Sequence, residues 1–159
     1  MVVDGSGKPM FLADVALKEG IIVGVGDFTA SSAEQIIDAS GCYVAPGFVD
    51  VNNHSDTYWE LLAQPELAGM LCQGVTTVIG GNSGSSLAPF ANPAVIRSIQ
   101  KWTDVEKVNF NWLSMEGFLD EVERRRPGTN FGTLVGHGTL RRGVMRDENR
   151  PIRPEEISS

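Results

Sequence analysis

Apolar and polar positions along the first part of the chain predict short strands rather than helices. Residues 14–18 alternate apolar with polar side chains, and Glu19 and Gly20 link them to a second apolar run at residues 21–26. Two short runs joined by a glycine-containing pair are typical of a β-hairpin. A third strand is expected at residues 35–38, so the segment 1–45 is predicted to be a small β module.

The pattern changes after residue 41, where apolar runs begin to alternate with segments of helical spacing. A short run at residues 48–51 precedes apolar residues at helical spacing up to Gly74, with Pro65 starting or kinking a helix. Residues 75–80 form a β-branched run typical of a strand buried on both faces of a parallel sheet. The remaining expected elements are a helix at 94–102 opened by Pro93, a helix capped by Ser114 that carries Met115, Phe118, Leu119 and Val122 on one face, a strand at 130–135, and a glycine-flanked loop at 136–139.

This order of elements predicts an α/β fold in which helical crossovers connect the strands of a parallel sheet. Each strand ends in a glycine-rich polar loop, and ligands of such folds bind at the carboxyl ends of the strands. We therefore expect the functional site within residues 46–159. Helix-start signals at residues 153–157 precede the end of the sequence by about one turn, which indicates a fragment of a longer protein.

The composition of the chain excludes some classes of function. The net charge of −7 and the pI near 4.8 disfavour nucleic-acid binding, because an acidic surface repels phosphates. No apolar run approaches the roughly 18 residues that a membrane span needs, and the first ten residues do not look like a signal peptide. Cys42 and Cys72 are too few for a disulfide framework, so we expect each of them to be a small buried residue. These features together fit a cytoplasmic protein.

Several stretches of the chain resemble one enzyme family. Residues 46–54, PGFVDVNNH, resemble the first barrel strand of the amidohydrolase superfamily, whose usual pattern is P-G-F-[IV]-D-x-H-x-H. Residues 73–90 (QGVTTVIGGNSGSSLAPF) and 134–145 (LVGHGTLRRGVM) are similar to segments of the N-acyl-D-amino-acid deacylases, the D-aminoacylase family. Residues 2–26 are similar to the N-terminal β module of that family without its first strand. The resemblance covers essentially the whole chain.

The resemblance implies a fold and a reaction. The fold is a metal-dependent hydrolase (β/α)8 TIM barrel, of which residues 46–159 would form about the first three βα units, preceded by a partial β-sandwich module at residues 1–45. The reaction is hydrolysis of the amide bond of a small-molecule N-acyl-D-amino acid by water activated on Zn²⁺ or another divalent metal. Because such a barrel takes about 250 residues, we expect the chain alone to be inactive.

The chain departs from the family pattern at two positions that the resemblance assigns to metal binding. Asn52 replaces the first histidine of H-x-H, and Ser83 replaces a bridging cysteine. Residues two apart on a strand point the same way, so Asn52 and His54 are expected side by side. An amide oxygen is a weak ligand for zinc, and a serine hydroxyl is not ionised near neutral pH. We therefore expect His54 as the metal ligand, Asn52 and Ser83 as weak ligands, and one metal position weak or empty.

Each candidate residue has an alternative explanation. His54 could be a strand-end histidine bonded to a carbonyl, and Asn52 and Ser83 could bond to local backbone. His137 has either a substrate-side role or a role in loop structure. Asp50 and Asp56 are interpreted as structural, and the arginines at 124–126 and 141–142 as solvated.

The function also has alternatives. The catalytic residues and most specificity contacts are expected beyond this chain, and the sequence does not predict the oligomeric state. The chain could instead belong to a non-catalytic amidohydrolase-like scaffold, since both weak positions have lost their strong ligands. It could also belong to another amide or cyclic-amide hydrolase of the same superfamily.

Overall fold

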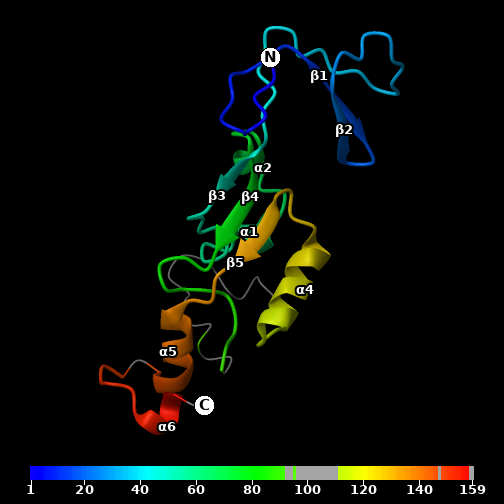
Figure 1. Cartoon of the computed structure of the whole chain (residues 1–159). Coiled ribbons are helices and arrows are strands. Elements are labelled where there is room, and N and C mark those ends of the chain that lie inside the picture. Colours follow the sequence, from blue (N-terminus) through cyan, green and yellow to red (C-terminus); the bar gives the residue numbers. More distant parts are fainter. Residues whose placement is uncertain (92–94, 96–110, 147, 158–159) are drawn as a thin grey trace. The chain divides into compact units, whose positions relative to one another are not determined.

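The structure, a computed structural model, describes residues 1–91, 95, 111–146 and 148–157 (Figure 1). The chain divides into two compact units, Met1–Pro46 and Gly47–Ser159. The helix predicted at residues 94–102 lies outside the described residues, apart from residue 95.

The first unit contains the predicted hairpin. Strand β1 (Asp14–Lys18) pairs antiparallel with β2 (Ile21–Gly26), and Glu19 and Gly20 form the turn between them. Both turn residues have a positive φ, 52° and 77° respectively, as a tight two-residue hairpin turn requires. The prediction of this hairpin from alternation and a glycine-containing link is confirmed.

The prediction of a third strand at residues 35–38 is wrong. These residues form no strand, and Ile36 and Ile37 are largely exposed. The carboxylate of Asp38 accepts the backbone N–H of Ser40 at 2.8 Å, so the chain turns locally instead of pairing with a strand. Isolated bridges from Val2 to Phe11 and from Val2 to Val44 close the unit, and Val2 is buried.

The second unit contains the predicted parallel sheet. Its strands β3 (Phe48–Asp50), β4 (Val75–Gly80) and β5 (Asn130–Thr133) lie in the order β3-β4-β5, and both pairs are parallel (Figure 1). The central strand β4 has Val78 fully buried, while Val75, Thr77 and Ile79 on the other face are half-buried. The prediction of an α/β arrangement is therefore confirmed.

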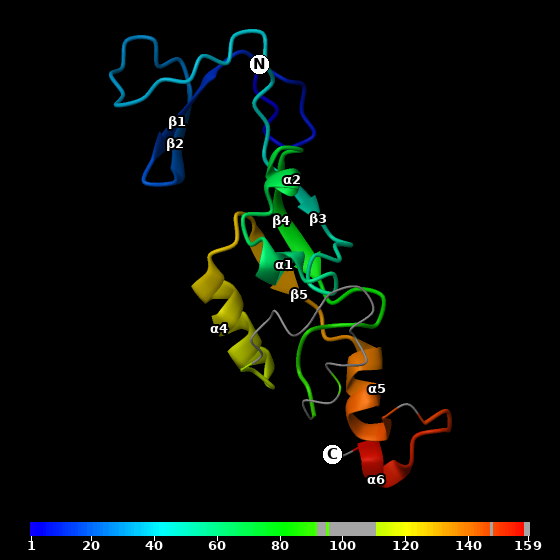
Figure 2. The same ribbon diagram turned by 180° about the vertical axis from the view of Figure 1, so that it is seen from behind.

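Helices form the crossovers between the strands. Two short helices, α1 (Glu60–Ala63) and α2 (Ala68–Leu71), separate β3 from β4, and Pro65 lies between them as predicted. Helix α4 (Met115–Arg125) precedes β5. Helices α1 and α4 lie on the same side of the sheet (Figure 2), where Arg125 of α4 donates a hydrogen bond to the backbone carbonyl of Leu62.

Two later elements differ from the sequence prediction. The strand expected at 130–135 ends at Thr133, and helix α5 (His137–Met145) begins where a loop was expected at 136–139. A further short helix, α6 (Pro154–Ile157), confirms the helix-start signals at 153–157. None of the helices in the described part of the chain has the length and apolar character needed to cross a membrane.

Helix α4 begins as predicted, and Phe118 and Val122 of its predicted apolar face are buried, whereas Leu119 is 40% exposed. The Oγ of Ser114 accepts the N–H of Gly117 at 3.0 Å, which caps the helix, and Arg126 ends it in a left-handed conformation. Phe118 is fully buried, with its ring centroid 5.6 Å from that of Trp112 and 6.0 Å from that of Phe131. Helix α4 is thereby fixed against the sheet.

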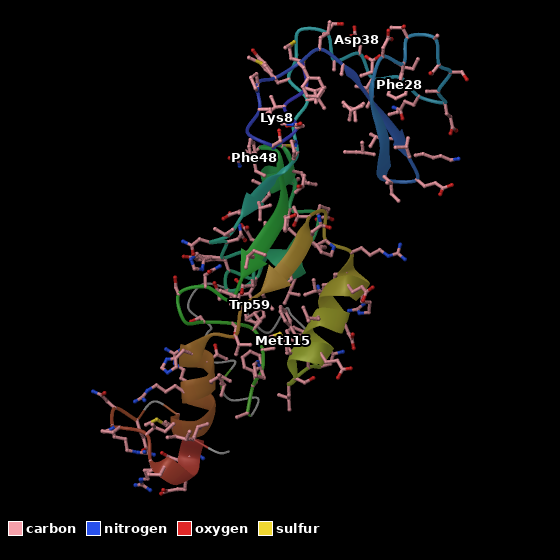
Figure 3. The ribbon with its side chains drawn as sticks, viewed as in Figure 1. Lys8, Phe28, Asp38, Phe48, Trp59 and Met115 are labelled. Carbon is pink, nitrogen blue, oxygen red and sulfur yellow. The ribbon has the colours of Figure 1, made fainter. Side chains whose placement is uncertain are left out.

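One apolar cluster joins the sheet to its helices. Met115 packs half-buried against this cluster, which also contains the fully buried Trp59 (Figure 3). The buried members are Trp59, Leu61, Leu62, Leu67, Val78, Leu87, Ala88, Phe90, Val95, Trp112, Phe118 and Val122. Neither cysteine belongs to it: Cys42 and Cys72 are both exposed free thiols, so the expectation that they are buried is wrong.

The Phe118→Ala substitution should destabilise the second unit by about 3–5 kcal/mol, because it removes a fully buried ring that packs against Trp112 and Phe131. Urea unfolding followed by far-ultraviolet circular dichroism measures this free energy. The matched control is Leu119→Ala, one residue along the same helix but 40% exposed, which should change it by less than about 1 kcal/mol. Equal effects of the two variants would contradict the assigned core.

Candidate functional site

The polar loops of the second unit follow the carboxyl ends of β3, β4 and β5, as predicted. They are the first loop (residues 51–56), the second loop (81–86) and the third loop (134–136). The strands are parallel, so their carboxyl ends lie at one edge of the sheet, the carboxyl edge (Figure 1). Hydrogen bonds that cross between the loops hold this edge together.

The side chain of Asp56 joins the first loop to the second. It is fully buried; Oδ2 accepts the N–H of Gly81 at 2.7 Å, and Oδ1 accepts the N–H of Thr57 at 2.7 Å. Burial raises the pKa of Asp56, an effect that these two N–H donors and the nearby His54 oppose. The carboxylate thus spans two loops that are 25 residues apart in sequence.

The second connection between these loops uses the backbone of Asn53 and the amide side chain of Asn82. Asn53 is buried, and its backbone N–H donates to the carbonyl of Ile79 at 3.1 Å. The Nδ2 of Asn82 donates to the carbonyls of Asn53, at 3.3 Å, and of Ile79, at 2.6 Å. The backbone of the first loop is therefore fixed on both sides of His54, by Asn53 and by Asp56.

The second loop is joined to α5 and to the third loop by hydroxyl groups. The Oγ1 of Thr139 accepts the N–H of Ser86 at 2.9 Å and donates to the Ser86 carbonyl at 3.1 Å. The Oγ of Ser86 in turn accepts the N–H of Gly136 at 2.9 Å and donates to the carbonyl of Ala88 at 2.6 Å. Both hydroxyl-bearing residues are buried. Because the groups satisfy one another, the start of α5 has a fixed position against the second loop.

His54 lies near two carboxylates, that of Asp50 at the end of β3 and that of Asp56 in its own loop. It is half-buried, and its ring meets that of Tyr58 edge-on at 6.4 Å between centroids. Hydrogen bonds from the Asn53 side chain and then from the Asn52 N–H lower the pKa of Asp50, and His54 adds to the effect. His54 is thus in electrostatic contact with both Asp50 and Asp56. Asp50 and Asp56 both make the structural hydrogen bonds expected from the sequence.

The other two predicted ligands lie in exposed turns. Strand β3 ends at Asp50, and Asn52 lies exposed in the turn that follows. The argument that Asn52 and His54 share one face of a regular strand is therefore wrong, because the strand ends before either residue. Ser83 is also exposed and has a φ of 55°, an uncommon conformation for a residue other than glycine.

His137 is the first residue of α5 and not part of a loop. Its side chain is exposed, whereas the preceding Gly136 is buried against the second loop. Glycine fits there because a Cβ on residue 136 would lie 2.7 Å from backbone atoms of Gly84 and Ser85. A role of His137 toward a substrate remains a prediction.

The described residues do not form a complete zinc site. Within them, no three histidine, cysteine, aspartate or glutamate side chains lie close enough to hold a metal ion. Both oxygens of Asp50 and both oxygens of Asp56 already accept hydrogen bonds from N–H groups. Since a zinc site takes about four ligands, His54 with these neighbours is at most part of one.

Sequence reasoning missed the residues that hold the edge together. The interactions of Asn53, Asn82, Ser86 and Thr139 link positions up to 53 residues apart, and no local spacing indicates such pairs. In the H-x-H pattern, Asn53 stands at the unspecified position between the two ligand positions, so the pattern gives it no role. The adjacent glycines 80 and 81 were a usable signal, because paired glycines at a strand end indicate close approach of other groups.

A cavity of about 300 Å³ lies elsewhere in the second unit, between α4 and β5. It contains none of the predicted site residues. Its lining residues are Leu119, Val122, Glu123, Arg126, Pro127, Thr129, Asn130 and Phe131. The candidate site is therefore the carboxyl edge and not this cavity.

The structure is similar to solved structures of two deacylases. One is a crystal structure of D-aminoacylase described as defining a novel subset of amidohydrolases, with a TM-score of 0.83 and 38% identity over 99% of this chain and 32% of that one. The other is the N-acyl-D-glutamate deacylase of Bordetella bronchiseptica, in complex with zinc and a phosphonate inhibitor. It has a TM-score of 0.84 and 32% identity over the same shares. A further D-aminoacylase structure with a TM-score of 0.83 concerns the binuclear metal centre of that enzyme.

Curated relatives belong to the same group of enzymes. The D-aminoacylase of Alcaligenes xylosoxydans xylosoxydans is 35% identical over 99% of this chain and 32% of its own length. The N-acyl-D-aspartate deacylase of the same organism is 38% identical over 94% of this chain and 29% of its own length. The chain thus spans about a third of the length of these relatives.

The Thr139→Val substitution should lower the free energy of unfolding by about 1–3 kcal/mol, since it leaves the buried N–H and C=O of Ser86 without their partner. Amide hydrogen exchange at Ser86 should also become faster. The matched control is Thr133→Val, whose hydroxyl donates only to the neighbouring carbonyl of Leu134 at the surface. A Thr139→Val variant as stable as this control would contradict the connection between the second loop and α5.

Beyond these individual relatives, a sequence model of the amidohydrolase family matches residues 35–157. This match covers most of the chain and includes all three loops of the carboxyl edge. The family assignment made from the sequence motifs is therefore confirmed. The relatives are hydrolases that act on carbon–nitrogen bonds other than peptide bonds. The chain belongs to the amidohydrolase family and is similar to its N-acyl-D-amino-acid deacylases.

Proposed function

We propose that the chain forms part of the active site of a metal-dependent amidohydrolase that converts an N-acyl-D-amino acid into a D-amino acid and a carboxylate. The observation that supports this most strongly is the similarity to D-aminoacylase over 99% of the chain, at a TM-score of 0.83. The loops of the carboxyl edge fall within the matched region. The substrate is a small molecule, as the names of the relatives indicate.

We assign roles to four residues in this reaction. His54 is a metal ligand, because it offers a half-buried imidazole beside two carboxylates. Asn52 and Ser83 are weak ligands at best, and His137 faces the substrate side. Zn²⁺ or another divalent metal would polarise the amide carbonyl and activate water. Since the described residues do not complete a metal site, the remaining ligands must come from outside them.

We further infer that residues 1–45 belong to a partial β-sandwich module and that residues 46–159 form about three βα units of a (β/α)8 barrel. The parallel order β3-β4-β5 with helical crossovers supports the barrel assignment. A cytoplasmic location is part of the proposal, and the exposed free thiols of Cys42 and Cys72 support it, because reducing compartments keep thiols unpaired.

A second candidate function is a non-catalytic scaffold with the same fold. The observation in its favour is that Asn52 and Ser83, both exposed, stand where the family pattern has strong ligands. Such a protein would keep the hydrogen-bonded edge without binding zinc. Hydrolysis of other amides or cyclic amides is the third alternative, and a panel of N-acyl-D- and N-acyl-L-amino acids distinguishes it from deacylation of D-amino acids.

The 159-residue chain alone should not hydrolyse N-acetyl-D-amino acids in the presence of Zn²⁺, because its described residues supply too few ligands. Release of free D-amino acid, followed by a D-amino-acid oxidase assay, measures the activity. A complete D-aminoacylase at the same concentration serves as the positive control. Zinc-dependent turnover by the purified chain, abolished by a chelator, would show that this part of the proposal is wrong.

The double substitution Asn52→His with Ser83→Cys should raise the zinc affinity of the chain at least tenfold, because imidazole and thiolate are strong zinc ligands. Both positions are exposed, so the core stays intact. Competition with a chromophoric zinc chelator measures the affinity. Adding His54→Ala to the double variant should reverse most of the gain, whereas adding His137→Ala should not. An unchanged affinity in the double variant would contradict the assigned ligand positions.

A further inference from the structure

We propose that Asp56 is a positioning residue that holds the loop carrying His54 against the loop carrying Ser83, and that Gly80 and Gly81 form the receptor for its carboxylate. The purpose of this role, which is to hold the two loops that carry candidate metal ligands at a fixed separation, rests on the proposed function. The connection itself follows from the geometry of the described residues.

The carboxylate of Asp56 reaches across two loops. Oδ1 accepts an N–H from Thr57 in its own segment, and Oδ2 accepts the N–H of Gly81 in the second loop, both at 2.7 Å. His54 lies two residues before Asp56, and Ser83 lies two residues after Gly81. A short connection therefore runs from one candidate ligand through a single side chain to the other.

Gly80 and Gly81 leave the space that this carboxylate occupies. A Cβ on residue 80 would lie 2.7 Å from Oδ2 and 2.8 Å from Cγ of Asp56, so any larger side chain would displace the carboxylate. Gly81 has a φ of 73°, and a Cβ there would lie 2.0 Å from the carbonyl oxygen of Leu134. Only glycine at both positions lets the backbone present its N–H to Asp56 at this distance.

Stability alone does not explain a carboxylate at this position. Removing a charged group from water costs free energy, and an apolar side chain in the same place would avoid that cost. A carboxylate instead fixes the orientation of the side chain, because two fixed N–H donors determine where each oxygen lies. We therefore infer that the side chain sets the geometry between the loops and does more than fill space.

Asp50, the last residue of β3, provides a matched comparison next to the same loop. Its carboxylate also accepts two hydrogen bonds near His54, from the Asn52 N–H at 3.1 Å and from the Asn53 side chain at 2.9 Å. Both donors belong to the first loop, so among the described residues these bonds do not tie Asp50 to the second loop. The Asp56→Asn and Asp50→Asn variants each replace one carboxylate by an amide, but only the first removes a charged acceptor from Gly81.

The test is amide hydrogen exchange and two-dimensional nitrogen–proton NMR on the whole 159-residue chain and its two variants. Asp56→Asn should speed exchange at Gly81 at least about tenfold and shift the amide signals of both His54 and Ser83. Asp50→Asn should leave Gly81 and Ser83 close to wild type. Signals of the β1–β2 hairpin and of α4 should be unchanged in both variants and report that the chain is folded.

Unchanged Gly81 and Ser83 signals in a folded Asp56→Asn variant would overturn the proposal, as would equal effects of the two variants. Should Asp56→Asn fail to fold, the wild-type chain still decides the matter. A scalar coupling across the hydrogen bond, from the Gly81 nitrogen to the Asp56 carboxyl carbon, is expected. Its absence, together with fast exchange at Gly81, rejects the connection.

A titration with Mn²⁺ separates this proposal from the proposed function. In the wild type, paramagnetic broadening should affect the His54 and Ser83 amides at the same Mn²⁺ concentration. In Asp56→Asn, joint broadening should need about tenfold more Mn²⁺, a typical effect of losing a group that supports a metal ligand. If Mn²⁺ broadens neither amide while the exchange result holds, the metal role of the site fails and the positioning by Asp56 stands.

Discussion

The candidate site depends on the hydrogen bond between the buried carboxylate of Asp56 and the N–H of Gly81. Neighbouring parallel strands hydrogen-bond along their length, but nothing in the sheet itself fixes the loops beyond the strand ends. Asp56, together with Asn82, supplies that connection between the first and second loops, and Ser86 with Thr139 supplies it between the second loop and α5. The position of His54 is therefore determined by contacts outside the β-ladder.

The apolar packing of the second unit supports one side of the sheet more than the other. Phe118, Trp59 and Val78 are fully buried where α1 and α4 cover the sheet. On the edge strand β3, in contrast, Phe48 is 64% exposed and Val49 is 57% exposed. Parallel sheets are normally covered on both faces, so the described residues hold the site loops in place without enclosing them. Catalysis needs such an enclosure, because water-filled surroundings weaken the electrostatic interactions at the reacting atoms.

The sequence predicted the elements whose signals are local. Alternation and a glycine-containing link predicted the β1–β2 hairpin, and a β-branched run predicted β4, because both patterns act over neighbouring residues. The strand predicted around Ile36 and Ile37 is wrong, because two apolar residues form a strand only where a partner strand is present. The start of α5 at His137 was missed because Thr139 bonds to Ser86, 53 positions earlier, and such a distant contact leaves no local pattern.

The same distinction separates the frame of the site from its chemistry. The frame residues Asp56, Ser86 and Thr139 are buried and bond across loops, so each substitution there disturbs two segments at once. Asn52 and Ser83, the positions that depart from the family pattern, lie exposed in turns. The hydrogen bonds of Asp56, Ser86 and Thr139 involve the side chain of neither Asn52 nor Ser83, so substitutions at these turns leave the frame in place. The hydrogen bonds of the frame and the metal content of the edge are therefore two separate properties, and each must be measured by itself.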